Sequence, residues 1–173
     1  GASINGLNPK AASPEATAGL WRHLLDIDLV ATVKAWGRPA DEEILSLVRE
    51  PRRLKFTVSD GLWVRLIDIP GSLTGRSYSS NGRLVVDVRD AFRPTTSGRY
   101  ELVVEGSEGK CASTDAEPDL ACGVAVLGAV YLGGSSFRRL ARIGQVRELT
   151  DNALARADSM FAWDPSPWFG FIF

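Results

Sequence analysis

The order of strand-forming and helix-forming segments is the strongest constraint on the fold of this 173-residue chain. Short runs rich in β-branched and aromatic residues follow one another through its middle. We predict strands at residues 54–58, 62–69, 83–88, 99–105 and 109–114. The first two flank Ser59-Asp60-Gly61, a turn sequence that predicts a hairpin.

Helical segments come after these strands. Pro70 is predicted to open a short helix, and three longer helices are predicted at residues 120–132, 136–143 and 151–161. Gly133-Gly134 and Gly144 mark the ends of the first two, and Thr150 is the predicted cap of the third. Strands first and helices afterwards is the order of an α+β fold, here a mostly antiparallel sheet with helices packed on it.

The first third of the chain predicts too few elements for a core of its own. Ser13 and Pro14 are typical of a helix N-terminus, and a strand is predicted at residues 29–36. Asp41 is the predicted cap of a second short helix that ends at Pro51. The composition changes near residues 51–60, so we predict two domains, residues 1–56 and residues 57–173.

Charge and hydropathy exclude two kinds of partner. The chain carries 20 basic and 21 acidic residues, a net charge of −1, without a basic run that would indicate nucleic-acid binding. Its most continuous apolar run, residues 123–134, is too short to span a bilayer. The N-terminus shows no signal segment. These features predict a soluble, cytoplasmic protein.

Sulfur and imidazole offer little for catalysis or metal binding. Cys111 and Cys122 bracket an acidic loop, and without a secretion signal we expect two reduced thiols, although a disulfide is geometrically allowed. The single histidine, His23, lies beside the apolar face of the first predicted helix. A zinc site or a Ser-His-Asp triad is therefore not expected.

Nucleotide-binding motifs are absent. No GxxxxGK[ST] loop and no GxGxxG follows a predicted strand, and the [QR]xxGx[GA] pattern common for acetyl-CoA is also missing. The outward residues Trp63, Arg65 and Ile67 of one predicted strand either line a pocket or belong to a strand buried on both faces.

The C-terminal tail is unusually aromatic, with Trp163, Trp168, Phe169, Phe171 and Phe173 in its last eleven positions. Such a tail is expected to dock on the body of the protein. Docking would place the terminal carboxylate of Phe173 at a fixed point. Alternatively, the tail is only a plug over a core.

Several blocks in the same order make the sequence similar to a known family. They are LWRHLLDIDLVATV, RPADEEIL with EPRRL, SDGLWVRLIDIPGSL, FRPTTSGRYEL, DAEPDL, VLGAVYLGG, GQVRELTDNALARADSMF and DPSPWFGFIF. Together they resemble the C-terminal part of the Eis-type (enhanced intracellular survival) N-acetyltransferases. The resemblance implies that residues 1–56 end a second GNAT-like α/β domain. It also implies that residues 57–173 form a sterol-carrier-protein-like (SCP2-like) α+β domain.

The family transfers acetyl from acetyl-CoA to amines, including those of aminoglycosides, and forms homo-oligomers. The resemblance implies that the Phe173 carboxylate is the general base, with a tyrosine of a missing domain as general acid. The residues it nominates for the acceptor pocket are Trp63, Asp68, Trp168, Phe171 and Ile172. Many members have Cys where this chain has Phe169, which puts the local packing of the tail in doubt.

The resemblance further implies that acetyl-CoA binds to the missing N-terminal GNAT domains, so no cofactor is expected on this chain. Alone, it is predicted to be catalytically incomplete. Two other classes of function stay open: a stand-alone SCP2-like module that binds a lipid or other apolar ligand, and a structural oligomerisation domain.

Overall fold

The computed structural model describes residues 2–7 and 11–170, which form two compact units. The first unit comprises the described residues up to Leu62 together with Trp168–Gly170. The second comprises Trp63–Pro167. The tail therefore leaves the second unit after Pro167 and its next three residues cluster with the first unit.

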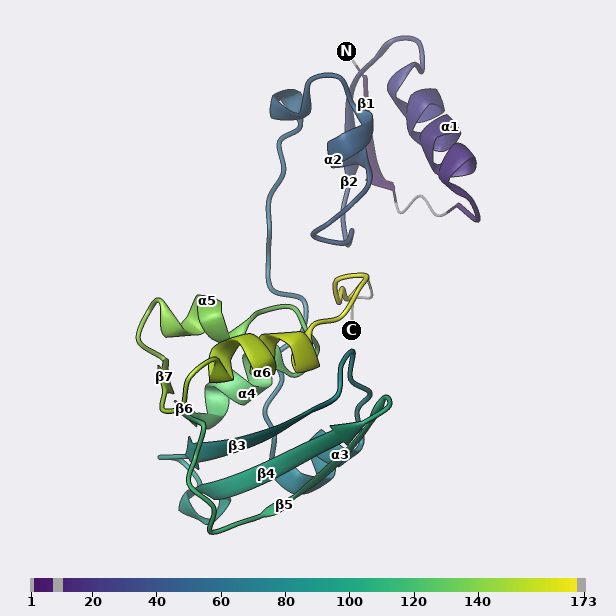
Figure 1. Cartoon of the computed structure of the whole chain (residues 1–173). Helices are drawn as coiled ribbons and strands as arrows, with labels where there is room; N and C mark the ends of the chain where they lie inside the picture. The colour runs from purple at the N-terminus through teal and green to yellow at the C-terminus, as the bar shows by residue number, and fades with distance from the viewer. Residues whose placement is uncertain (1, 8–10, 171–173) are drawn as a thin grey trace. The chain divides into compact units, whose positions relative to one another are not determined.

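The first unit contains a two-stranded parallel sheet and one long helix (Figure 1). Strand β1 (Ala2–Leu7) pairs with β2 (Val30–Ala35), and α1 spans Pro14–Leu25. The predicted cap is confirmed, since the Ser13 side chain accepts a hydrogen bond from the Ala16 N–H. Strand β1 is not among the predicted strands, because the short segment Ala2–Leu7 lacks a run of β-branched residues.

A buried carboxylate fixes the turn before α2 (Ile44–Leu47). Glu42 is buried and accepts a 3.3 Å hydrogen bond from the Trp21 indole. It also accepts two hydrogen bonds of 2.7 Å from the Arg38 guanidinium. Helix α2 therefore begins after Glu43, and the prediction that Asp41 caps it is wrong. A single 3₁₀ turn, Pro51–Arg53, follows.

The second unit is built on a five-stranded mixed sheet in the order β5-β4-β3-β6-β7 (Figure 1). All neighbouring pairs are antiparallel except β3 with β6, which are parallel. The strand bounds are β3 Gly82–Arg89, β4 Gly98–Glu105, β5 Glu108–Ser113, β6 Leu120–Gly123 and β7 Val146–Glu148. The predicted strands at 83–88, 99–105 and 109–114 are confirmed.

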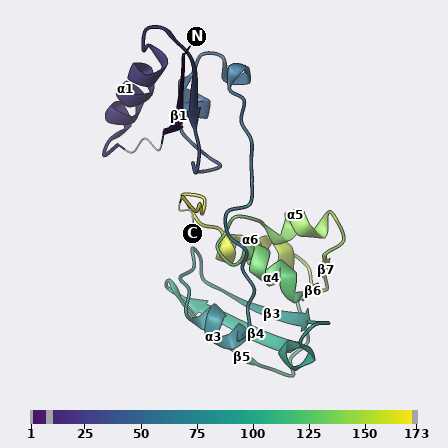
Figure 2. The ribbon, with the colours of Figure 1, turned by 180° about the vertical axis from the view of Figure 1, so that it is seen from behind.

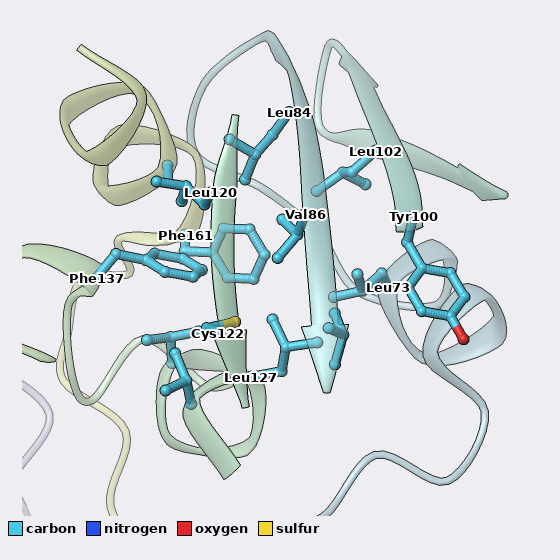
Figure 3. Close-up of a cluster of buried hydrophobic side chains, with 14 of the residues drawn as sticks. Leu73, Leu84, Val86, Tyr100, Leu102, Leu120, Cys122, Leu127, Phe137 and Phe161 are labelled. Atoms are coloured by element: carbon cyan, nitrogen blue, oxygen red, sulfur yellow. The ribbon is translucent and has the colours of Figure 1, made fainter. Parts of the chain in front are cut away.

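Helices cover one face of this sheet and enclose the core. The helices are α3 (Ile69–Thr74), α4 (Val124–Val130), α5 (Phe137–Ala141) and α6 (Ala153–Phe161), with a 3₁₀ turn at Pro94–Thr96. Helices α4, α5 and α6 lie over one face in both views, and α3 lies beside β5 (Figures 1 and 2). Side chains from strands and helices interdigitate between them (Figure 3).

Residues 54–58 and 62–69 are not strands, so the predicted hairpin is wrong. Burial still alternates along the second segment, where Val64 and Leu66 pack on the core. The Val64 carbonyl oxygen lies directly against Gly128 of α4, 2.2 Å from where a Cβ would stand. Val64 and Leu66 thus pack on a helix and on the core. This segment has no strand partner among the described residues.

Residues 120–123 form β6 and not the first turn of a helix. Leu120 pairs with Val86 of β3 on one side and with Glu148 of β7 on the other. The sequence gives no strand signal here, because Ala121 and Gly123 have low β propensity. Strand β7 is only three residues long and was not predicted.

The third predicted cap is also corrected. Helix α6 begins after Asn152, which is left-handed with φ 61°. The Thr150 hydroxyl instead donates a 2.6 Å hydrogen bond to the Asp119 carboxylate. The Thr150 side chain therefore binds the buried Asp119 and does not cap α6.

Both cysteines are free, as predicted. Cys111 lies on β5 and Cys122 on β6, with β4 and β3 between them. Strands are about 4.8 Å apart, so the two residues are separated by far more than the Cα distance that a disulfide allows.

Candidate functional site

The predicted pocket residues fall in different parts of the chain. Trp63 and Asp68 belong to the second unit and Trp168 to the first, while Phe171, Ile172 and Phe173 lie outside the described residues. Trp63 is 84% exposed. Its neighbour on the same face, Ile67, is also exposed, so the interpretation as a strand buried on both faces is wrong for the described chain.

Asp68 has a structural task in this chain. It is the N-cap of α3, and its Oδ1 accepts a 3.0 Å hydrogen bond from the Gly71 N–H. Pro70 occupies the first turn of the same helix, as the sequence predicts. This carboxylate is therefore oriented by a backbone donor.

An ion pair joins Arg65 to the loop after β3. Arg65 Nη2 donates to both oxygens of the buried Asp90 carboxylate, at 2.7 and 2.6 Å, and the Arg65 guanidinium stacks over the Phe92 ring at 5.4 Å. Burial opposes ionisation of Asp90, but hydrogen bonds from the Arg93 N–H and from Arg65 outweigh it and hold its pKa below the usual range. The pair is satisfied internally and serves to fix this loop.

The tail begins where α6 ends, over a glycine loop. A Cβ on Gly133 would stand 2.9 Å from Trp163 Cβ and 3.2 Å from the Phe161 carbonyl oxygen. A Cβ on Gly134 would stand 3.2 Å from the Pro167 ring. Trp163 and Pro167 therefore lie directly on the Gly133-Gly134 backbone, and we call this contact the tail exit.

A surface pocket of about 350 Å³ adjoins the tail exit. Its polar side chains come from α5, α6 and the glycine loop, and Trp163 forms its aromatic wall. The Asp158 carboxylate in this pocket accepts a 2.6 Å hydrogen bond from the Phe137 N–H at the start of α5. The residues that line it are Gly133, Gly134, Ser135, Ser136, Arg139, Asp158, Phe161, Ala162 and Trp163.

Beyond the tail exit, the tail packs on glycines of the first unit. A Cβ on Gly61 would lie 3.3 Å from Phe169 Cβ, and one on Gly37 would lie 3.6 Å from the Gly170 Cα. Gly37 is left-handed, with φ 62°. Phe169, which departs from the family pattern, thus has its own packing partner in this chain.

The N-terminus of α1 has a side-chain cap and an acidic first turn. A pyrophosphate needs free N–H groups at a helix N-terminus, but in α1 the Ala16 N–H donates to Ser13 Oγ. Glu15 adds a negative charge in the first turn.

Two further searches bear on ligands and membranes. No group of three or more His, Cys, Asp or Glu side chains that could hold a metal ion occurs in residues 2–7 and 11–170. Over the same ranges, every helix is too short or too polar to cross a bilayer.

Sequence reasoning missed the arginine beside the tail exit. Arg76 hydrogen-bonds to carbonyl groups 55 and 85 positions away along the chain. No local pattern could have found these partners. The paired glycines at 133–134 were a usable signal, and they were interpreted only as a helix end.

The sequence matches two protein families in succession. The acetyltransferase (GNAT) domain family matches residues 10–66, and the sterol carrier protein domain family matches residues 69–170. The second match covers more than half of the chain.

Individual relatives extend this result. An uncharacterized N-acetyltransferase of Streptomyces avermitilis is 43% identical over 92% of this chain and 39% of its own length. The N-acetyltransferase Eis of Mycobacterium tuberculosis is 28% identical over 90% of the chain and 38% of its length. The crystal structure of Eis1 from Mycobacterium abscessus has a TM-score of 0.83 at 34% identity, covering 99% of this chain and 43% of that one.

The chain spans about two fifths of the length of the curated relatives it matches. The relatives named above are N-acetyltransferases, Eis among them. The mixed α/β fold of this chain carries the GNAT-matched region before the sterol-carrier-matched region. The chain therefore belongs to the sterol carrier protein domain family, and a region that the acetyltransferase (GNAT) domain family matches precedes this domain.

Proposed function

We propose that this chain is the C-terminal part of an Eis-like, acetyl-CoA-dependent N-acetyltransferase and supplies the general base through its terminal carboxylate. One observation carries the proposal. Trp168–Gly170 cluster with the unit that the GNAT family matches, although the preceding residues belong to the sterol-carrier-like unit. A tail that leaves its own domain can carry a terminal carboxylate toward a site in the missing GNAT domains, which is where the resemblance puts the acetyl transfer.

The chemistry explains why a carboxylate is useful there. An acceptor amine is an ammonium ion at neutral pH and must lose a proton before its nitrogen can attack the thioester carbonyl. The carboxylate accepts that proton, the N–C bond forms and the C–S bond breaks. The nitrogen gives a second proton to solvent as it becomes an amide, and CoA leaves as its thiol. The proton for that thiol comes from an acid outside this chain.

The acceptor is an amine, and aminoglycosides are the class that the family resemblance suggests. Trp63 is the described candidate for contacting it, because its indole is exposed. Asp68 already caps α3, so its contribution is a fixed negative charge for an ammonium group. Trp168, Phe171 and Ile172 stay proposals, as do acetyl-CoA binding by further domains and assembly into a homo-oligomer.

Lipid binding has less support. Core side chains from the sheet and helices pack against one another where an apolar ligand would have to lie (Figure 3). The pocket at the tail exit opens at the surface, and six of its nine lining residues are polar or glycine. No observation favours a second function.

The test compares the chain alone with the chain joined to the part it lacks. The part of the Streptomyces avermitilis relative that this chain does not match, about three fifths of its length, would be placed before this chain to make a chimera. We expect CoA release with an aminoglycoside such as tobramycin from the chimera, and neither CoA release nor acetyl-CoA binding from the chain alone. Turnover by the chain alone, or an inactive but folded chimera, would overturn the proposal.

A further inference from the structure

Each of the last four carbonyl groups of α6 accepts a hydrogen bond, and three of these bonds come from a distant segment of the chain. The last four carbonyls of a helix have no partner within it. The Asp158 carbonyl accepts from the Ala162 N–H at 2.9 Å. The next two, at positions 159 and 160, accept from the Ser79 hydroxyl (2.6 Å) and the Ser79 N–H (3.3 Å).

Arg76 supplies the fourth contact and reaches a second helix end. Its Nη2 donates to the Phe161 carbonyl at 3.3 Å, and its Nη1 donates to the Tyr131 carbonyl at 2.6 Å. Tyr131 is the C-cap of α4. One guanidinium thus joins the ends of both helices, where the helix dipole favours a positive charge.

Aromatic rings surround this guanidinium. It lies 4.6 Å from the ring centres of Tyr78 and Phe161 and 5.9 Å from that of Tyr131. Among the described residues, no carboxylate forms an ion pair with it. Burial lowers the pKa of Arg76, yet an arginine stays charged at any physiological pH. Partial burial of this cation costs desolvation free energy, and only carbonyl groups and aromatic rings compensate for it.

The two carbonyls that Arg76 binds stand at the tail exit. Phe161 is the last residue before the tail, and Tyr131 lies two residues before Gly133. The Arg76 side chain therefore connects the start of the glycine loop to the start of the tail. Nothing else in the described chain bridges these two carbonyl groups.

We propose that Arg76, with Ser79, is a positioning residue: it fixes where the tail leaves the sterol-carrier-like unit and thereby where the terminal carboxylate can reach. This inference rests on the proposed function for its catalytic consequence. A displacement of about 1 Å can cost on the order of a hundredfold in rate, so a base at the end of a twelve-residue tail needs a fixed origin.

The first test needs no activity. Hydrogen exchange of the amides at 162–170 would be compared in the wild-type chain, Arg76→Met and Arg76→Lys, with the exposed Arg142→Met as the matched control. We expect at least tenfold faster exchange of the tail amides in Arg76→Met and an intermediate increase in Arg76→Lys, because lysine reaches one carbonyl at a time. Amides of residues 84–88 should change less than twofold. If Arg76→Met does not fold, Ser79→Ala is the substitute.

Three results would overturn the inference: an unprotected tail in the wild type, unchanged protection in Arg76→Met, or equal acceleration of tail and sheet. In the chimera, Arg76→Met should lower kcat at least tenfold while the KM for acetyl-CoA stays unchanged; an unchanged kcat would contradict the catalytic consequence. Failure of the proposed function is distinguishable, because the wild-type chimera would then be inactive whatever the exchange data show.

Discussion

At the residue scale, the Asp119 carboxylate joins three parts of the second unit. It accepts hydrogen bonds from the Val85 N–H and the Thr150 hydroxyl, and Arg156 lies 2.9 Å away. Burial alone would raise the pKa of Asp119, but these contacts outweigh it and hold the pKa below the usual range. The carboxylate is thus a stabilising charge that favours the folded state.

We predict that Asp119→Asn lowers the free energy of unfolding by about 2 kcal/mol at pH 7. Because the folded-state pKa lies below the unfolded value, this stabilisation is present above about pH 4 and is lost as the pH falls through the folded pKa. Urea titrations at several pH values would show the variant and the wild type converging in acid. The exposed Asp115→Asn is the control and should change little. A difference that persists in strong acid would contradict the assignment.

The thiols give a second prediction at this scale. Burial, with a smaller effect of Asp87, raises the pKa of Cys122 to about 12, and burial with Asp68 raises that of Cys111 to about 11. The reactive thiolate is then scarce at pH 8. We expect Cys122 in the folded protein to react with a disulfide reagent at least roughly a thousandfold more slowly than after unfolding in urea, with Cys111 intermediate. Rapid labelling of folded Cys122 would contradict its burial.

At the scale of elements, the glycine loop under the tail offers a matched pair of substitutions. Gly133 and Gly144 are both left-handed, with φ 85° and 76°, and both follow a helix. A Cβ on Gly144 would meet nothing within 4 Å, whereas one on Gly133 would collide with Trp163 and Phe161. Gly144→Ala should therefore cost about 1 kcal/mol for its backbone alone.

Gly133→Ala should cost about 3 kcal/mol, because overpacking against the tail adds to the same backbone strain. Urea unfolding of the two variants measures the difference. Equal costs would show that the tail does not press on this loop.

How much of each element the sequence predicts depends on whether its cause is local. The cap Ser13 lies beside its helix and was predicted, whereas Ser136 was predicted inside a helix and is in fact its cap. The β-branched run at 54–58 was misleading, because such residues suit any extended segment and do not specify a partner. Strand β6 required β3 and β7 on either side. The same limit hid Arg76, whose partners are distant in the sequence.

At the scale of the whole molecule, the tail has residues in both of the units that the two families match. Trp163 and Pro167 lie on the glycine loop of one unit, and residues 168–170 cluster with the other. The aromatic composition of the tail predicts docking, and its described part does pack on glycine backbones. Which unit receives it could not be predicted from composition, since that depends on contacts at Gly37 and Gly61.

The central claim is that the terminal carboxylate of Phe173 acts as the base. The most direct measurement is the kcat of the chimera before and after Gly-Ser is added behind Phe173, with the same two residues added at the N-terminus as the control. We predict that the C-terminal extension lowers kcat on the order of a hundredfold or more without changing the KM for acetyl-CoA, as loss of a general base does. Full activity with the extended tail would contradict the account.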